Sequence, residues 1–256
     1  MSKLVNLEID NGCATVTLND PAKGNALSLD LLTDLKAALQ KITTDKSVRF
    51  LVITGSGDHA FSDGSDVGLV ENFSAKEVEE YIRLGQLVLN IIYRADIISV
   101  AAINGSALGS GLELALSCDI RLAADGAQLG FPEVAMGLIP FFGGTQRLPR
   151  MVGLGLTFEM ILSGRILSAK DAAEIRLVNH CYKAAELPSK TASMIELLST
   201  DKSPAAQKLA RWLIHSSLDL PMSAGLEREI ISFSELFSAK DTREAMSRYK
   251  SSKNKK

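Results

Sequence analysis

The stretch SVAAINGSALGSGLELALSCD, residues 99–119, contains the change of pattern that decides the fold. It opens with an apolar run, Ser99–Ile103, which is typical of a strand buried on both faces. A glycine-rich segment follows, and an apolar helix then begins with one carboxylate, Glu113, inside it. Because burial of a charged group is costly, Glu113 is a candidate functional residue.

The same order of strand, glycine loop and helix occurs earlier in the chain. Phe50–Ile53 is a second apolar run, which a polar, glycine-bearing loop over residues 54–66 follows. Residues 75–95 then have the spacing of an amphipathic helix. This recurrence predicts an α/β core with mostly parallel strands. The apolar positions of this helix are Val78, Ile82, Leu87, Ile91 and Ile92.

Shorter signals complete this core. Asn11-Gly12 lies between two alternating runs and predicts a hairpin. Ser28 is the expected N-cap of a helix that extends to Ile42. Further strands are expected over 119–124, 128–131 and 177–182, and a helical region over 143–162 that Pro149, Gly153 and Gly155 interrupt.

The end of the chain has a different pattern. From about Lys190 onward only helical spacing remains, and Pro204 and Pro221 are the expected helix starts. The sequence therefore predicts a core over residues 1–190 and a helical region over residues 191–256.

Composition limits the possible functions. The net charge is −2, from 28 basic and 30 acidic residues, so no overall field favours nucleic acid or acidic lipid. Cys13, Cys118 and Cys181 have no CxxC spacing, which favours a reducing compartment and offers no metal site. No signal-peptide pattern and no apolar run of ~20 residues is present. We expect a cytoplasmic protein without a metal, a nucleic-acid partner or a membrane anchor.

Two glycine loops are candidates for binding an anion. Gly64-Ser65-Asp66 and Gly109-Ser110-Gly111 both follow apolar runs, and glycine lets backbone N–H groups approach a ligand closely. Two such loops that face each other would supply paired donors for an oxyanion. The alternative is that both are tight turns. The motifs GxGxxG, GxxxxGK[ST] and GxSxG are absent, which disfavours a dinucleotide site, a P-loop and a serine nucleophile.

Two glutamates are candidates for proton transfer. Glu113 lies one helical turn after Ser110, and Glu133 follows Pro132 in an otherwise apolar stretch. Apolar surroundings raise the pKa of a carboxyl group towards neutrality, where it exchanges protons readily. The alternatives are a charge favoured by the helix dipole for Glu113 and a solvent-facing turn residue for Glu133.

Longer segments resemble one known family. AFSDGSD (residues 60–66) and FPEVAMGLIPFFGGTQRLPR (residues 131–150), together with the opening stretch, closely resemble the enoyl-CoA hydratase/isomerase (crotonase) family. NDPAKGNALS, LSGRILSAKDAAEIRLVN and LFSAKDTREAM extend the resemblance almost end to end. It implies a spiral of repeated ββα units, a C-terminal helical trimerisation region, and a homotrimer or hexamer.

The resemblance also implies roles for residues. The backbone N–H groups of Ser65 and Ser110 would polarise the carbonyl of an acyl-CoA thioester. Glu113 would activate water for attack at C3, and Glu133 would protonate C2. Coenzyme A is then part of the substrate, and no separate cofactor is expected. The positions that would contact substrate or CoA are Lys23, Asn25, Ala26, Leu27, Ala60, Asp63, Gly64, Asp66, Gly109 and Phe141.

Several residues depart from the family pattern. Ser65 stands where alanine is usual, Ser110 where glycine is usual, and Asp63 where the residue is usually small and neutral. Phe141 and Phe142 replace small residues and could narrow the acyl pocket. Phe141 also occupies the position of an acid in dienoyl-CoA isomerases, which disfavours that activity.

The resemblance favours hydration of a 2-enoyl-CoA, because both glutamates are present. The alternatives are a Δ3-to-Δ2 enoyl-CoA isomerase, which needs only the acid at Glu133, a carrier-protein-linked dehydratase or decarboxylase, and a non-catalytic acyl-CoA binder.

Overall fold

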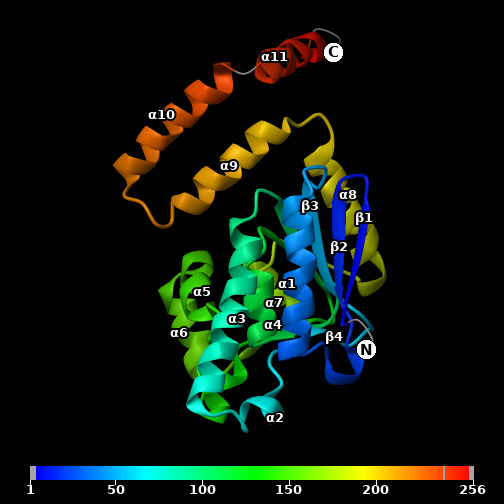
Figure 1. Cartoon of the computed structure of the whole chain (residues 1–256), viewed down its shortest axis with the longest axis vertical. Coiled ribbons are helices and arrows are strands. Elements are labelled where there is room, and N and C mark those ends of the chain that lie inside the picture. Colours follow the sequence, from blue (N-terminus) through cyan, green and yellow to red (C-terminus); the bar gives the residue numbers. More distant parts are fainter. Residues whose placement is uncertain (1–3, 239, 254–256) are drawn as a thin grey trace. The chain divides into compact units, whose positions relative to one another are not determined.

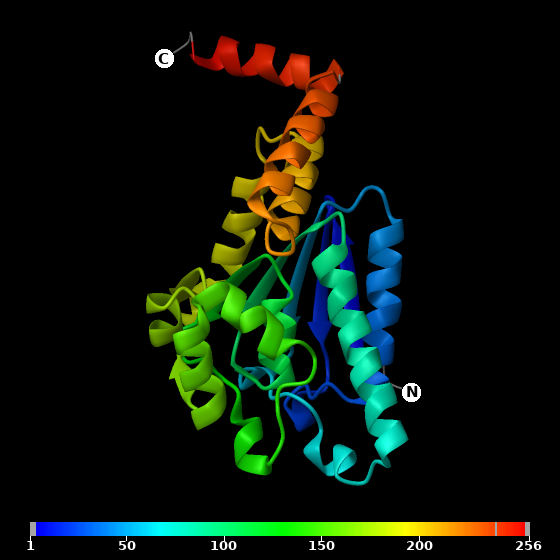
Figure 2. The ribbon, with the colours of Figure 1, turned by 90° about the vertical axis from the view of Figure 1, so that its left-hand side faces the viewer.

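The computed structural model describes residues 4–238 and 240–253, which divide into two compact units (Figures 1 and 2). The division falls between Ile195 and Glu196, inside helix α8 (Leu187–Ser199). It lies close to the position where the sequence pattern becomes purely helical. No helix in these described ranges is long and apolar enough to cross a membrane.

A six-stranded sheet runs through the first unit in the order β1-β2-β3-β5-β7-β10. Strands β1 and β2 form the predicted antiparallel hairpin, with positive φ at both Asn11 (48°) and Gly12 (76°). The other neighbouring strands are parallel, which confirms the predicted core, although β10 covers only the second half of its predicted range. The strands are β1 (Val5–Asp10), β2 (Cys13–Leu18), β3 (Phe50–Gly55), β5 (Ile98–Ile103), β7 (Ile120–Ala124) and β10 (His180–Tyr182).

The inner strands of this sheet bury both faces. In β3, Leu51 and Ile53 belong to the main core, whereas Val52 belongs to a second apolar cluster with Leu187 of α8. Successive side chains of a strand point to opposite faces, so the two clusters lie on either side of the sheet. This explains why the strands read as continuous apolar runs.

A second sheet of four short strands has the order β4-β6-β8-β9. β4, β6 and β8 are parallel to one another, and β9 is antiparallel to β8. The prediction of loops at β4 and β6 was wrong, because three-residue strands are too short to show an alternating pattern. The strands are β4 (Ala60–Ser62), β6 (Ser106–Leu108), β8 (Gln128–Gly130) and β9 (Ile166–Ser168).

Helices α1 (Leu29–Thr44) and α3 (Ala75–Arg94) lie side by side against the six-stranded sheet (Figures 1 and 2). The predicted N-cap of α1 is confirmed, because Ser28 Oγ accepts the N–H of Leu31 at 3.2 Å.

The predicted amphipathic helix is confirmed as α3, but its buried face follows the apolar positions of the sequence only in part. Leu87 is 47% exposed, whereas Ile92 is fully buried. The ring of Phe142 occupies the space that a side chain on Gly85 would need. Gly85 and Tyr81 are therefore part of the buried face, together with aliphatic residues. The buried residues are Tyr81, Gly85, Val88, Leu89 and Ile92.

The helical region after β8 is interrupted at only one of the three predicted positions. Pro149 lies inside α5 and Gly155 lies inside α6, while Gly153, with φ 82°, separates the two helices. A proline removes a single N–H from the ladder, and α5 continues past it. The shorter elements of the unit are α2 (Val67–Val70), α4 (Ser110–Leu116), η2 (Pro132–Met136), α5 (Gly144–Val152), α6 (Leu154–Ser163) and α7 (Ala169–Glu174).

The second unit is helical, as predicted. Pro204 begins α9 and Pro221 directly precedes α10, which confirms both helix starts. Large apolar side chains remain exposed on these helices, among them Ile214 and Phe233. The helices are α9 (Pro204–Ser216), α10 (Met222–Ser238) and α11 (Lys240–Lys253).

Candidate active site

The candidate site forms where three parallel strands end. β4, β6 and β8 are neighbours in the four-stranded sheet, so their carboxyl ends meet at one edge. Ser65 follows β4, Ser110 follows β6 and Glu133 follows β8. The sequence placed the two glycine loops after β3 and β5, but short strands of the second sheet intervene and bring the loops together.

Two backbone N–H groups at this edge are free to bind a ligand. The N–H groups of Ser65 and Ser110 have no hydrogen-bond acceptor among the residues that the structure describes. Gly64 and Gly109 have positive φ, 100° and 49°. A Cβ on Gly64 would lie 2.8 Å from the carbonyl oxygen of Leu108 and 3.5 Å from the nitrogen of Ser110, so the loops are in close contact. Such a donor pair can stabilise a developing oxyanion.

Glu113 is fully buried on α4. Its Oε1 accepts the N–H groups of Phe142 at 2.9 Å and Gly144 at 2.5 Å, while Oε2 has no partner within the described ranges. Burial raises the pKa of the Glu113 carboxyl, although these two N–H groups and the guanidinium of Arg147 oppose the rise. One oxygen is therefore held in place, and the other is available for a proton.

Glu133 is only 4% exposed on the 3-10 helix η2, which excludes a solvent-facing turn residue. Its Oε2 has no hydrogen-bond partner in the described part of the chain. A Cβ on Gly109 would lie 2.8 Å from Glu133 Oε1, so the carboxyl lies directly against the second glycine loop. Burial, and to a smaller extent the charge of Glu113, raise the pKa of Glu133 to about 7.

A cavity of about 40 Å³ is lined by both serines and by Glu133, whereas Glu113 is not among its lining residues. It places the two unpaired N–H groups beside a carboxyl group whose pKa burial raises to about 7. The lining residues are Asp63, Gly64, Ser65, Val67, Val70, Gly109, Ser110, Pro132, Glu133, Met136, Leu138 and Phe141.

Six of the residues predicted to contact substrate or CoA are buried, namely Asn25, Ala26, Leu27, Ala60, Gly64 and Gly109. Asn25 Nδ2 donates to the carbonyl oxygen of Ala60 at 2.8 Å, and the Leu27 N–H donates to the Gly64 carbonyl at 2.7 Å. These bonds tie the segment before α1 to β4 and to the first glycine loop. The Asn25 amide therefore supports the loop.

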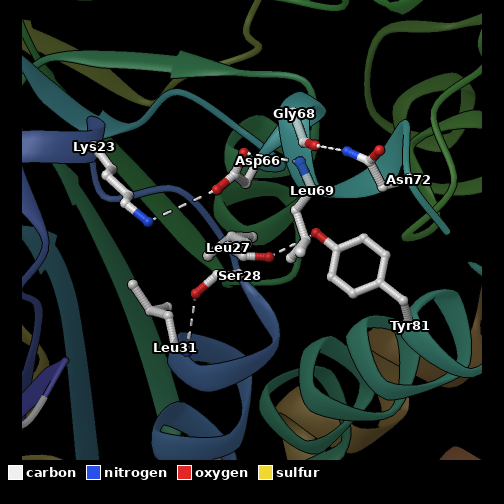
Figure 3. Close-up of polar contacts among 9 residues, drawn as sticks. All are labelled: Lys23, Leu27, Ser28, Leu31, Asp66, Gly68, Leu69, Asn72 and Tyr81. Atoms are coloured by element: carbon white, nitrogen blue, oxygen red, sulfur yellow. Dashed lines mark hydrogen bonds and ion pairs between the residues drawn. The ribbon is translucent and has the colours of Figure 1, made fainter. Parts of the chain in front are cut away.

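Two charged residues of the predicted CoA region, Lys23 and Asp66, point toward each other (Figure 3). Lys23 Nζ is 3.9 Å from Asp66 Oδ2, and the lysine side chain is 63% exposed. Asp66 also accepts the N–H of Leu69 at 3.2 Å and so caps α2. Asp63 Oδ1 accepts the hydroxyl of Ser106 at 2.7 Å at the rim of the cavity.

Tyr81 was missed by sequence reasoning. Its hydroxyl donates to the Leu27 carbonyl at 2.6 Å (Figure 3) and lies 2.8 Å from Ser65 Oγ. Its ring packs at 5.2 Å from that of Phe142, between centroids. The one available signal was the spacing of Tyr81 and Gly85, which lie one helical turn apart.

Comparison with known proteins identifies the family. The model of the enoyl-CoA hydratase/isomerase family matches residues 8–256. Crotonyl-CoA hydratase of Syntrophomonas wolfei is 35% identical, over 95% of this chain and 93% of the relative. The short-chain-enoyl-CoA hydratase of Clostridium acetobutylicum is also 35% identical, with the same coverage of 95% and 93%.

Solved structures agree with this match. The enoyl-CoA hydratase of Bacillus anthracis superposes with a TM-score of 0.93 at 31% identity, over 97% of this chain and 96% of that chain. A putative enoyl-CoA hydratase of Thermobifida fusca, solved in complex with CoA, gives a TM-score of 0.84 at 31% identity, over 93% and 95% of the two chains. The predicted crotonase fold is confirmed, and this chain is an enzyme that belongs to the enoyl-CoA hydratase/isomerase family.

Proposed function

We propose that the protein adds water reversibly across the 2,3 double bond of an enoyl-CoA thioester. The observation that carries this proposal is the pair of buried glutamates beside the two unpaired N–H groups. Each glutamate keeps one oxygen, Oε2, without a hydrogen-bond partner among the described residues. Hydration needs one group to take a proton from water and one to supply a proton to carbon.

The residues divide the reaction as follows. The N–H groups of Ser65 and Ser110 bind the thioester oxygen and stabilise the negative charge that develops there as C3 is attacked. Ionised Glu113 removes a proton from water through Oε2 while the water oxygen bonds to C3. Protonated Glu133 then gives its proton to C2, and the carbonyl reforms. The pKa of about 7 at Glu133 suits a group that must give and regain a proton near neutral pH.

The substrate class follows from the relatives. The named relatives are hydratases of CoA thioesters, and the Thermobifida fusca structure was solved with CoA. We infer that CoA is part of the substrate, with no separate cofactor. A homotrimer or hexamer and a cytoplasmic location stay predictions, and the apolar side chains exposed on α9 and α10 support the first of these.

One observation favours a second candidate, the Δ3-to-Δ2 isomerase. Glu133 lines the cavity, whereas Glu113 does not. Isomerisation needs one acid to move a proton between C2 and C4, and Glu133 alone could do this.

Glutamine variants distinguish these activities. Four-carbon and eight-carbon 2-enoyl-CoAs are offered to the parent, and the loss of conjugated-thioester absorbance is followed. For a hydratase, Glu113→Gln and Glu133→Gln should each lower kcat by at least about 100-fold. For an isomerase assayed with 3-enoyl-CoA, only Glu133→Gln should do so. Glu174→Gln, on the exposed side of α7, is the matched control.

Absence of hydration with every 2-enoyl-CoA would refute the proposal. Turnover of carrier-protein-bound thioesters alone would indicate the carrier-linked enzyme. Binding of CoA thioesters that both glutamine variants leave unchanged, without any turnover, would indicate a non-catalytic binder.

A further inference from the structure

Both residues that supply the unpaired N–H groups also carry a hydroxyl. Ser65 Oγ and Ser110 Oγ lie 2.8 Å apart, which is hydrogen-bond distance. Ser110 is only 2% exposed. A backbone N–H donates whatever the side chain is, so the donor pair by itself does not need these hydroxyls. Their contact instead joins the loop after β4 to the helix start after β6.

The hydroxyl pair continues to Tyr81. The Tyr81 oxygen lies 2.6 Å from the Leu27 carbonyl oxygen and 2.8 Å from Ser65 Oγ. Tyr81 has one hydroxyl hydrogen, and a carbonyl oxygen can only accept. Tyr81 therefore donates to Leu27, Ser65 donates to Tyr81, and Ser110 donates to Ser65. Burial raises the pKa of Tyr81, so the phenol keeps its proton.

In this order of donors, the hydroxyl hydrogens of Ser110, Ser65 and Tyr81 are all engaged in hydrogen bonds. None is left to bind a thioester oxygen, so the hydroxyls do not extend the donor pair. The hydroxyl groups instead hold in place the two residues whose backbone N–H groups are the donors. Gly64, directly before Ser65, is held in addition by the Leu27 N–H, which donates to its carbonyl at 2.7 Å. Leu27 is fully buried, so it anchors the first loop to the core.

We propose that the hydroxyl chain Ser110–Ser65–Tyr81 is a positioning device that sets the separation of the two N–H donors. The proposal rests on the proposed use of these donors as an oxyanion hole. Donors of this kind stabilise charge only when each lies close to where the oxygen will be, within about 2.7–3.1 Å. The two donors follow different strands, β4 and β6, and the Ser65–Ser110 hydrogen bond is a direct side-chain link between them. Its loss should weaken charge stabilisation in the transition state more than binding of the ground state.

The test compares Ser65→Ala, Ser110→Ala and the double variant in the full-length protein. Loss of one complete oxyanion donor costs about 10²–10³ in kcat, so loss of its positioning should cost about tenfold, with KM changed less than about twofold. The double variant should be no slower than the slower single variant, because either change breaks the same link. Ser99→Ala is the matched control, since Ser99 is a buried serine with two bonds to Asp119 at the opposite end of β5.

A second readout does not depend on hydration. A 3-oxobutanoyl-CoA bound at the site forms an enolate, whose near-ultraviolet absorbance is titrated against pH. Loss of Ser65 or Ser110 should raise the apparent pKa of enolisation by about one unit, which is the same tenfold effect. Tyr81→Phe keeps the ring and removes the anchor, so it should shift the titration in the same direction.

The outcomes separate the two proposals. Parent values of kcat and of the enolisation pKa in Ser65→Ala and Ser110→Ala would overturn the positioning role, as would strictly multiplicative effects in the double variant. A parent that does not hydrate 2-enoyl-CoAs, but whose serine variants shift the enolisation pKa, would overturn only the proposed reaction. A parent that does neither would overturn both.

Discussion

Replacement of Glu133 by glutamine should make the protein more stable above pH 7, although the proposed mechanism predicts that it removes activity. In an unfolded chain this carboxyl has the ordinary pKa of 4.5, whereas in the folded protein its pKa is raised to about 7. Between these values the folded state binds more protons than the unfolded state, so the free energy of unfolding falls as the pH rises. The free energy of unfolding falls by about 1.4 kcal/mol for each pH unit between these two pKa values, or by about 3 kcal/mol in all. Glutamine has nearly the same shape and carries no charge, so it avoids this loss.

Urea unfolding of the parent and of Glu133→Gln at pH 5 and pH 8 would measure the effect. The free energy of unfolding of the variant, relative to that of the parent, should rise by about 2 kcal/mol from pH 5 to pH 8. Glu174→Gln, an exposed position, should differ from the parent by the same small amount at both. If Glu133→Gln also differs from the parent equally at pH 5 and pH 8, Glu133 does not carry the raised pKa and the reasoning is refuted.

Two further substitutions test the packing around the site. In Gly85→Ala the added Cβ would lie 2.2 Å from the ring of Phe142, so thermal or urea unfolding should show a loss of about 1–3 kcal/mol. Gly225→Ala, where no atom lies within 4 Å, should be neutral or stabilising by up to about 1 kcal/mol, and the reverse ranking would contradict the packing described. Phe141→Ala enlarges the cavity. The ratio of kcat/KM for an eight-carbon 2-enoyl-CoA to kcat/KM for a four-carbon one should therefore rise by about tenfold. An unchanged ratio would mean that the ring does not limit chain length.

The parts of the fold that the sequence predicts are those with a strong local signal. The Asn11-Gly12 hairpin depends on two positive φ angles that few residue pairs adopt. The inner strands β3 and β5 could be predicted because burial on both faces makes each of them a nearly continuous apolar run. The Ser28 cap and the Pro204 helix start likewise depend on neighbouring residues alone.

The four-stranded sheet could not be predicted from pattern. Its strands have three residues each, so their pairing depends on contacts between segments far apart in the chain, as between Ala60 and Ser106. The full buried face of α3 could not be predicted either, because nothing local shows that Gly85 packs against the ring of Phe142, 57 positions later in the chain.

The candidate site could be predicted only in part, because only some of its residues contrast with their neighbours in the sequence. Glu113 is conspicuous because leucines surround it, and Glu133 because it follows a proline in an apolar stretch. Tyr81 has no such local contrast, and its role depends on Leu27 and Ser65, which the fold alone brings within reach.

The way Glu113 is held has a consequence for how this enzyme can diverge. Its Oε1 is bound by main-chain N–H groups of residues 142 and 144, which every amino acid except proline provides. The side chain at position 141 faces the cavity, one residue before the first of these donors. Mutation can therefore reshape the acyl pocket without moving the carboxyl group. On the proposed mechanism, the residue that limits the acyl chain and the N–H groups that hold the catalytic carboxyl share one short peptide segment but can change almost independently, so new substrates can be acquired one substitution at a time.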